Sequence, residues 1–253
     1  MAILDLPPDR WHTALGLPCG MQPVALILEG TWWRARATRN RLARLTDVTE
    51  TAFPDIFTGR WNGIPLAYCC AYGAARAVEP AHVFARMGTP LLIQIGTCGA
   101  MDGSMQTGTV MVPDTVEGRD GVSQLYCRDP VLALDPTRTV RAREMLTSRG
   151  IPVAGGRHLT WPSLFAQSDA DCAGWADEGL RTVDMETAAV AAVAHNFCTK
   201  AVALLTVWDC LAAGRTFLDP LTDAQARALA RANSVIFDVA LDLAAEVGLS
   251  HAA

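Results

Sequence analysis

The stretch Leu91-Leu-Ile-Gln-Ile-Gly-Thr-Cys-Gly-Ala100 decides the fold that we expect for this chain. Its apolar residues lack the polar alternation of a half-exposed strand, which indicates a strand buried on both faces, as in a parallel sheet. The run breaks into Gly96-Thr97-Cys98-Gly99. Glycine lets backbone N–H groups approach a ligand closely and the threonine adds a hydroxyl, so this turn suits an anion or a sugar.

A second informative segment is Val183-Asp-Met-Glu-Thr-Ala-Ala189, which places Glu186 among small apolar residues. We expect a buried helix over residues 184–197, with Glu186 at its start. A buried carboxylate is costly unless something binds it, and sugar hydroxyls would do so. A carboxylate at a helix N-terminus also interacts favourably with the helix dipole, so a structural role for Glu186 stays open.

The rest of the chain alternates predicted strands with predicted helices. Further strands are expected over residues 23–29, 55–71 (two strands around the turn Trp61-Asn62-Gly63), 107–113, 151–159 and 200–208. Further helices are expected over residues 32–45, 73–87, 136–149 and 222–247, the last with a capping box at Thr222-Asp-Ala-Gln225. The polar segment 117–136 is expected to form a loop over a pocket.

This alternation predicts an α/β fold: a single-domain three-layer α/β/α sandwich with a central mixed, mostly parallel sheet. The domain is expected to span residues 1–253, with residues 1–22 as an N-terminal extension. The 51% hydrophobic and 19% charged content suits a compact core. A net charge of −5 argues against a protein that binds a nucleic-acid backbone.

Eight cysteines are present, and none forms a C-x-x-C pair. They are expected to be reduced core residues, and no Cys/His cluster has zinc-ligand spacing, so no metal site is predicted. The longest apolar runs are too short to cross a bilayer. The segment Met1–Arg10 carries acids and prolines where a signal peptide needs a basic start and an apolar core. We therefore expect a cytoplasmic protein.

Chemistry-bearing residues follow several of the predicted strands. Gly30 ends the first strand, Gly96-Thr97 ends the buried strand, and Asp209 ends a late one. Ligands of α/β proteins bind at the carboxyl ends of strands, so these residues are expected to share one site.

In these features the chain resembles the nucleoside phosphorylase-I superfamily, which includes purine nucleoside and uridine phosphorylases and adenosylhomocysteine nucleosidases. The resemblance is strongest at Ile95-Gly-Thr-Cys-Gly99, at Gly108-Thr-Val110 and at Asp184-Met-Glu-Thr-Ala188, and it extends from about residue 23 to 245. It implies a homo-oligomer, a dimer or a hexamer, that takes inorganic phosphate as co-substrate and needs no cofactor.

The resemblance also implies roles for individual residues. Phosphate would be bound by Gly30, Arg34, Gln94 and Thr97; ribose by Thr97, Met185 and Glu186; and the base by Phe165, Val183 and Asp209. Asp209 and Glu186 would be the catalytic residues. Cleavage of an N-glycosidic bond develops positive charge on the sugar, which Glu186 or an anionic nucleophile would stabilise, and negative charge on the base, which a proton from Asp209 would neutralise.

The favoured activity is phosphorolysis of a purine nucleoside, which gives free base and ribose 1-phosphate. Two departures from the family pattern leave alternatives open. Gln94 stands where phosphorylases usually carry an arginine, and Ala52 falls near the position of a second arginine that a neighbouring subunit donates. An uncharged amide cannot give the bidentate clamp of arginine. A nucleosidase that uses water, and a non-catalytic nucleoside-binding protein, therefore remain as alternatives.

Overall fold

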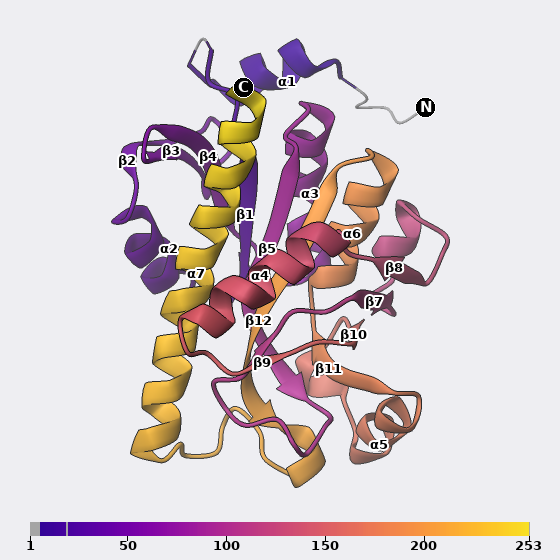
Figure 1. The fold of residues 1–253 in the computed structure, drawn as a ribbon. Coiled ribbons are helices and arrows are strands. Elements are labelled where there is room, and N and C mark those ends of the chain that lie inside the picture. The colour runs from indigo at the N-terminus through magenta and orange to yellow at the C-terminus, as the bar shows by residue number, and fades with distance from the viewer. Residues whose placement is uncertain (1–5, 19, 253) are drawn as a thin grey trace.

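The computed structural model of the chain describes residues 6–18 and 20–252 (Figure 1). It contains one continuous sheet with helices packed on both faces. In this part of the chain no helix is both long and apolar enough to cross a membrane.

The strands and helices follow in chain order. The strands are β1 (Ala25–Gly30), β2 (Thr46–Glu50), β3 (Ile56–Trp61), β4 (Ile64–Cys70), β5 (Leu91–Ala100), β6 (Val110–Met111), β7 (Thr115–Gly118), β8 (Val131–Ala133), β9 (Val153–Ala154), β10 (Arg157–Thr160), β11 (Leu180–Asp184) and β12 (Lys200–Cys210). The α-helices are α1 (Pro8–Ala14), α2 (Arg34–Leu42), α3 (Ala74–Arg86), α4 (Pro136–Ser148), α5 (Asp169–Asp177), α6 (Thr187–Asn196) and α7 (Asp223–Ala252). Short 3₁₀ turns are η1 (Ser123–Leu125), η2 (Leu164–Ala166) and η3 (Leu211–Ala213).

The sheet has the strand order β2-β3-β4-β1-β5-β11-β10-β7-β8, and β12, β6 and β9 branch from β5. The predicted buried strand β5 is central: β1 and β12 both run parallel to it, and β11 joins its last residues antiparallel. The turn expected at residues 96–99 is wrong, because β5 continues through these residues to Ala100, where β12 and β11 pair with it. Six of the strand pairs among the described residues are parallel and five are antiparallel. The mixed sheet is confirmed, with parallel pairs in a narrow majority because β2, β3 and β4 form an antiparallel meander.

The alternation of side chains along β1 separates two cores. Leu26 and Leu28 pack in one cluster with α3 and α6, whereas Ala25 and Ile27 pack in another with α4 and α7. Successive side chains of a strand point to opposite faces, so one strand supplies both cores. Figure 1 shows α4 and α7 crossing the face toward the viewer, with α3 behind the sheet. The three-layer α/β/α sandwich is therefore confirmed.

Most predicted elements are present. The hairpin turn between β3 and β4 places Asn62 and Gly63 in the left-handed region, at φ values of 49° and 79°. The capping box before α7 forms as expected: Gln225 N–H donates to Thr222 Oγ1 at 3.3 Å, and Thr222 N–H donates to Gln225 Oε1 at 3.0 Å. The sequence analysis did not predict α1, β2, β7, β8, α5 or β11.

Two further expectations concern residues 117–136 and residues 1–22. A loop over the pocket at residues 117–136 is wrong: the segment carries η1 and β8, and Val122, Tyr126 and Cys127 pack against the core beside α3 and α6. The extension predicted at residues 1–22 lies partly outside the described residues. In its described part, α1 and the residues after it bury the apolar side chains Trp11, Leu15, Leu17 and Met21.

Candidate active site

A pocket opens at the carboxyl ends of β1, β5 and β12, with an empty volume of about 680 Å³ that includes space open to solvent. It is lined by Gly30, Thr31, Trp32, Trp33, Tyr72, Thr97, Cys98, Gly99, Leu164, Gln167, Val183, Asp184, Met185, Glu186, Trp208, Asp209, Leu211 and Phe217. Parallel strands end together at this edge of the sheet, which is where open α/β sheets bind ligands.

Glu186 occupies the N-cap position of α6 and is 4% exposed. The N–H of Gly73, which begins α3, donates to its Oε1 at 2.6 Å. Its carboxylate lies directly against Gly30: a Cβ at that position would be 2.5 Å from Glu186 Oε2. Since no side chain longer than hydrogen fits there, the glycine that ends β1 is a steric requirement of the buried carboxylate.

Burial raises the pKa of Glu186 to about 8, and the negative charge of Asp184 adds to this effect. The N–H groups of Gly73 and Met185 act in the opposite direction. A buried carboxylate without a cation partner holds its proton more tightly because the charged form loses hydration.

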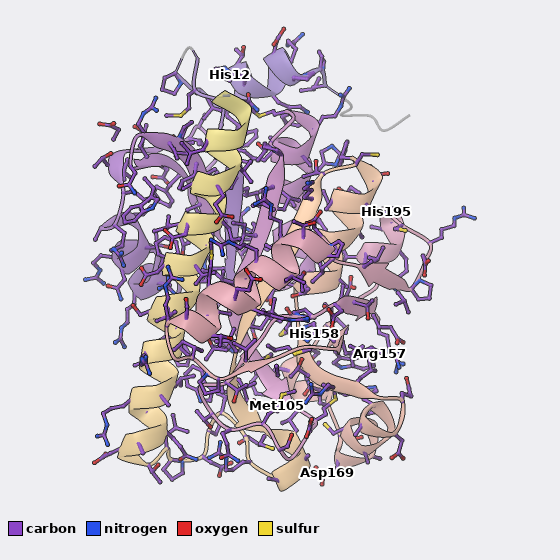
Figure 2. All side chains as sticks on the ribbon, viewed as in Figure 1. His12, Met105, Arg157, His158, Asp169 and His195 are labelled. Atoms are coloured by element: carbon purple, nitrogen blue, oxygen red, sulfur yellow. The ribbon has the colours of Figure 1, made fainter. Side chains whose placement is uncertain are left out.

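Asp184 lies two residues before Glu186 in the chain. It stays ionised because hydrogen-bond donors surround its carboxylate. His158 Nε2 lies 3.0 Å from Asp184 Oδ1, and the hydroxyls of Thr160 and Thr187 donate to the carboxylate at 2.7 and 2.5 Å. Burial alone would raise the pKa of Asp184, but the charge of His158 and these hydrogen bonds outweigh it and lower the pKa. Figure 2 shows His158 in the middle of the molecule, whereas His195 lies toward the outer end of α6.

Asp209 enters the pocket through an irregularity in β12. Val207 pairs with Cys98 and Asp209 pairs with Gly99, so Trp208 is an extra residue that has no partner on β5. In a regular strand two adjacent side chains point to opposite faces, but this β-bulge lets both Trp208 and Asp209 line the pocket. Burial raises the pKa of Asp209 to about 6, against the opposing effects of the Phe217 N–H and the charge of Arg215.

The comparison with known sequences fits this geometry. The sequence profile of the phosphorylase superfamily matches residues 26–240, which extend from the second residue of β1 into α7. The chain belongs to the phosphorylase superfamily. A DeoD-type purine nucleoside phosphorylase from Alkaliphilus metalliredigens (strain QYMF) is 31% identical over 210 residues, which cover 79% of this chain and 88% of that protein.

One further sequence relative and one solved structure are also similar to this phosphorylase-superfamily member. A guanosine phosphorylase from Halorubrum lacusprofundi is 26% identical over 184 residues, covering 69% of this chain and 75% of that protein. The crystal structure of uridine phosphorylase from Vibrio fischeri ES114, complexed with 6-hydroxy-1-naphthoic acid, superposes with a TM-score of 0.75 at 19% identity. It covers 88% of this chain and 91% of that chain, and at this identity it shows the shared fold.

Nine site residues were predicted from the sequence. Six of them line the pocket described above: Gly30, Thr97, Val183, Met185, Glu186 and Asp209. Three do not. Arg34 is half exposed and forms an ion pair with Asp55. Gln94 is buried on the face of β5 that packs toward α3 and α6, where its amide donates to Ile95 O at 3.1 Å. Phe165 is 73% exposed and makes an edge contact with Trp32 at the pocket rim.

The sequence analysis missed the aromatic wall of the pocket. Trp32 packs on Tyr72, with 4.9 Å between ring centroids, and Trp33 stacks on Trp208 at 5.1 Å with an interplanar angle of 13°. A signal was present in the sequence, because Trp32 and Trp33 follow the end of β1 directly and Trp208 directly precedes Asp209. Among the residues that the structure describes, those of the pocket included, no group of three or more His, Cys, Asp or Glu side chains has a metal-binding arrangement.

Proposed function

We propose that this member of the phosphorylase superfamily cleaves the N-glycosidic bond of a purine nucleoside by phosphorolysis, giving free base and ribose 1-phosphate. The observation that supports it is the pair of buried carboxylates, Glu186 and Asp209, in one pocket beside the last residues of β5. Inorganic phosphate is the co-substrate, and no cofactor takes part. We further propose that it serves nucleoside salvage in the cytoplasm as a homo-oligomer.

The sugar is assigned to the Glu186 side of the pocket. An ionised Glu186 accepts hydrogen bonds from the 2′ and 3′ hydroxyls, beside Met185 and Thr97. As the bond from C1′ to the base breaks, positive charge grows on the sugar and the nearby carboxylate stabilises it.

The base is assigned to the Asp209 side. A phosphate oxygen forms the new bond to C1′, the bonding electron pair of the breaking C1′–N bond passes to the base, and the Asp209 carboxyl supplies the proton that neutralises it. A carboxyl with a pKa of about 6 holds that proton in a useful fraction near neutral pH. Each of the two groups would lower the barrier by about 2–4 kcal/mol.

Two further observations favour a purine. The relatives of highest identity reported above are named as purine nucleoside and guanosine phosphorylases. A buried acid that faces the base suits a purine, whose ring nitrogen takes a proton as the base leaves.

The test is incubation of the protein with a panel of nucleosides, with and without inorganic phosphate, and identification of products by mass spectrometry. We expect release of a purine base and ribose 1-phosphate, and only when phosphate is present. Base release at the same rate in phosphate-free buffer would refute phosphorolysis, and an absence of turnover for every nucleoside would favour a non-catalytic nucleoside-binding protein.

Hydrolysis by water is the second candidate function. It is favoured by the placement of Arg34 and Gln94, since neither lines the pocket in which the nucleophile must act. Its product would be free ribose, which the same mass measurement separates from ribose 1-phosphate.

A further inference from the structure

A second cavity lies between α2 and α7, with an empty volume of about 1730 Å³ that includes space open to solvent. We call it the α2–α7 groove. It shares five lining residues with the pocket that holds Glu186 and Asp209: Gly30, Thr31, Trp33, Thr97 and Trp208. The two cavities therefore meet at the end of β1, at Thr97 of β5 and at the stacked pair Trp33–Trp208. Thr97 lies on the face of β5 that packs toward α7, which brings it to the inner end of the groove.

Three arginines of α2 and its C-terminal end line the groove: Arg36, Arg41 and Arg44. Arg41 is buried and makes a bidentate pair with Glu29, with N–O distances of 3.0 and 2.9 Å. Arg44 pairs with Asp238 at 2.8 Å. The groove therefore contains two neutralised guanidinium groups, which contribute little net attraction for an anion.

Arg36 differs from the other two. It is exposed, and within the described part of the chain it has no carboxylate within ion-pair distance. Its guanidinium presents several N–H donors in a planar fork, which suits an oxyanion such as phosphate. The acids that line the groove are limited to Glu29, which Arg41 already neutralises, so the groove keeps a net positive charge.

We propose that the α2–α7 groove admits and binds the anionic nucleophile, inorganic phosphate, with Arg36 as its cation and the Thr97 hydroxyl at its inner end. This inference rests on the proposed phosphorolysis. It reassigns anion binding from Arg34, which is held by Asp55, and from Gln94, which lies on the opposite face of β5. It also means that phosphate and nucleoside reach C1′ through separate openings, so phosphate binds whether or not the nucleoside is present.

The first experiment measures phosphate binding to the whole protein without nucleoside, by isothermal titration calorimetry. Arg36→Gln should weaken phosphate binding at least tenfold, and Arg36→Lys should lie between it and the wild type. Arg39→Gln is the matched control, because Arg39 is an exposed arginine on the same helix that does not line the groove. Phosphate binding that is equal in wild type and Arg36→Gln, or absent from the wild type, would overturn the proposal.

The second experiment blocks the groove without changing its charge. Ala230 is an exposed α7 residue that lines the groove, whereas Ala224 is exposed on the same helix outside it. Ala230→Trp should raise the KM for phosphate about tenfold and leave the KM for nucleoside within twofold, whereas Ala224→Trp should change neither. An equal rise in both KM values would mean that the groove does not serve phosphate separately.

These measurements separate failure of the inference from failure of the proposed function. Phosphate-dependent base release with an unchanged phosphate KM in Arg36→Gln would retain phosphorolysis and reject the groove. Loss of phosphate binding in Arg36→Gln, in a protein that releases base without phosphate, would uphold the anion subsite and reject phosphorolysis.

Discussion

Glu186 and Asp209 are both carboxylates, yet their surroundings give them different chemistry. Glu186 is fully enclosed beside ionised Asp184, and its pKa is raised to about 8, whereas Asp209 is less enclosed and its pKa is raised to about 6. The proposed mechanism needs a proton on Asp209 and none on Glu186. The fraction of protein in that form is greatest between pH 6 and 8, because Glu186 gains a proton at lower pH and Asp209 loses its own at higher pH.

The resulting prediction concerns kcat/KM for nucleoside at saturating phosphate. In the wild type, kcat/KM should rise up to about pH 6, stay level, and fall above about pH 8. Asp209→Asn should lower it about 10²- to 10⁴-fold and abolish the fall at high pH, because the proton donor is gone. Asp169→Asn, an exposed control on α5, should match the wild type. A high-pH fall that persists in Asp209→Asn would remove Asp209 from the role of acid.

At the scale of elements, the site depends on the close approach of β1, β5 and α6. Gly30 pairs with Gly96, and a Cβ on Gly96 would lie 2.9 Å from the Gly30 carbonyl oxygen. On its other side Gly30 touches the Glu186 carboxylate. Two strand ends and a helix N-cap meet here with no room for a methyl group, which fixes the position of the carboxylate relative to the sheet.

Gly30→Ala should therefore displace the Glu186 side chain. We expect a loss of kcat/KM of about 10²-fold and a loss of about 1–3 kcal/mol in the free energy of unfolding from overpacking. Gly103→Ala is the control, since a Cβ there would meet no atom within 4 Å. In a Glu186→Ala background the same Gly30→Ala change should cost little further activity. Full additivity of the two losses in kcat/KM would show that Gly30 acts independently of Glu186.

The sequence predicts those elements that carry a local signal. The apolar run of β5 and the capping box of α7 are read directly from residue types. By contrast, β2 has five exposed residues and hence no apolar pattern, and β11 merges with the expected start of α6. The helix α5 has a capping box between Ser168 and Asp171 that the sequence analysis overlooked.

The site residues, too, divide into those that the sequence predicts from a local signal and those that depend on distant contacts. Glycines and acids at strand ends predict Gly30, Thr97, Glu186 and Asp209 as neighbours, because parallel strands end at one edge. The placement of Arg34 depends instead on Asp55, which is 21 residues away, and this pairing leaves no local trace in the sequence. Gln94 is set by the alternation of β5, which points it toward α3 and α6 and away from the groove.

At the scale of the whole molecule, the buried acids make stability depend on pH. The folded-state pKa of Glu186, about 8, exceeds its ordinary value of 4.5, and that of Asp209, about 6, exceeds 3.8. The folded protein therefore holds protons that the unfolded chain releases. This contribution to stability is complete below about pH 4 and is lost as the pH rises through 6 and then 8. Asp102 acts in the opposite sense at acid pH, since hydrogen bonds from Ser104 and Arg181 lower its pKa to about 2.

Urea denaturation at pH 5, 6, 7 and 8 tests this dependence. The free energy of unfolding should fall by up to about 1.4 kcal/mol per pH unit for each acid that titrates. Glu186→Gln, which cannot ionise, should show a shallower decline than the wild type over pH 5–8. The exposed control Glu144→Gln should keep the wild-type slope. Identical slopes in wild type and Glu186→Gln would mean that Glu186 is already ionised in the folded protein at pH 5.

The unpaired Trp208 in β12 has one last consequence. Without it, Val207 would still lie opposite Cys98 and Asp209 opposite Gly99, so a deletion of this single residue would leave the carboxyl on its present side of the sheet. The same deletion would take away the ring on which Trp33 stacks. The extra residue therefore serves the aromatic lining of the cavity, while the register of the two strands alone keeps the acid in place.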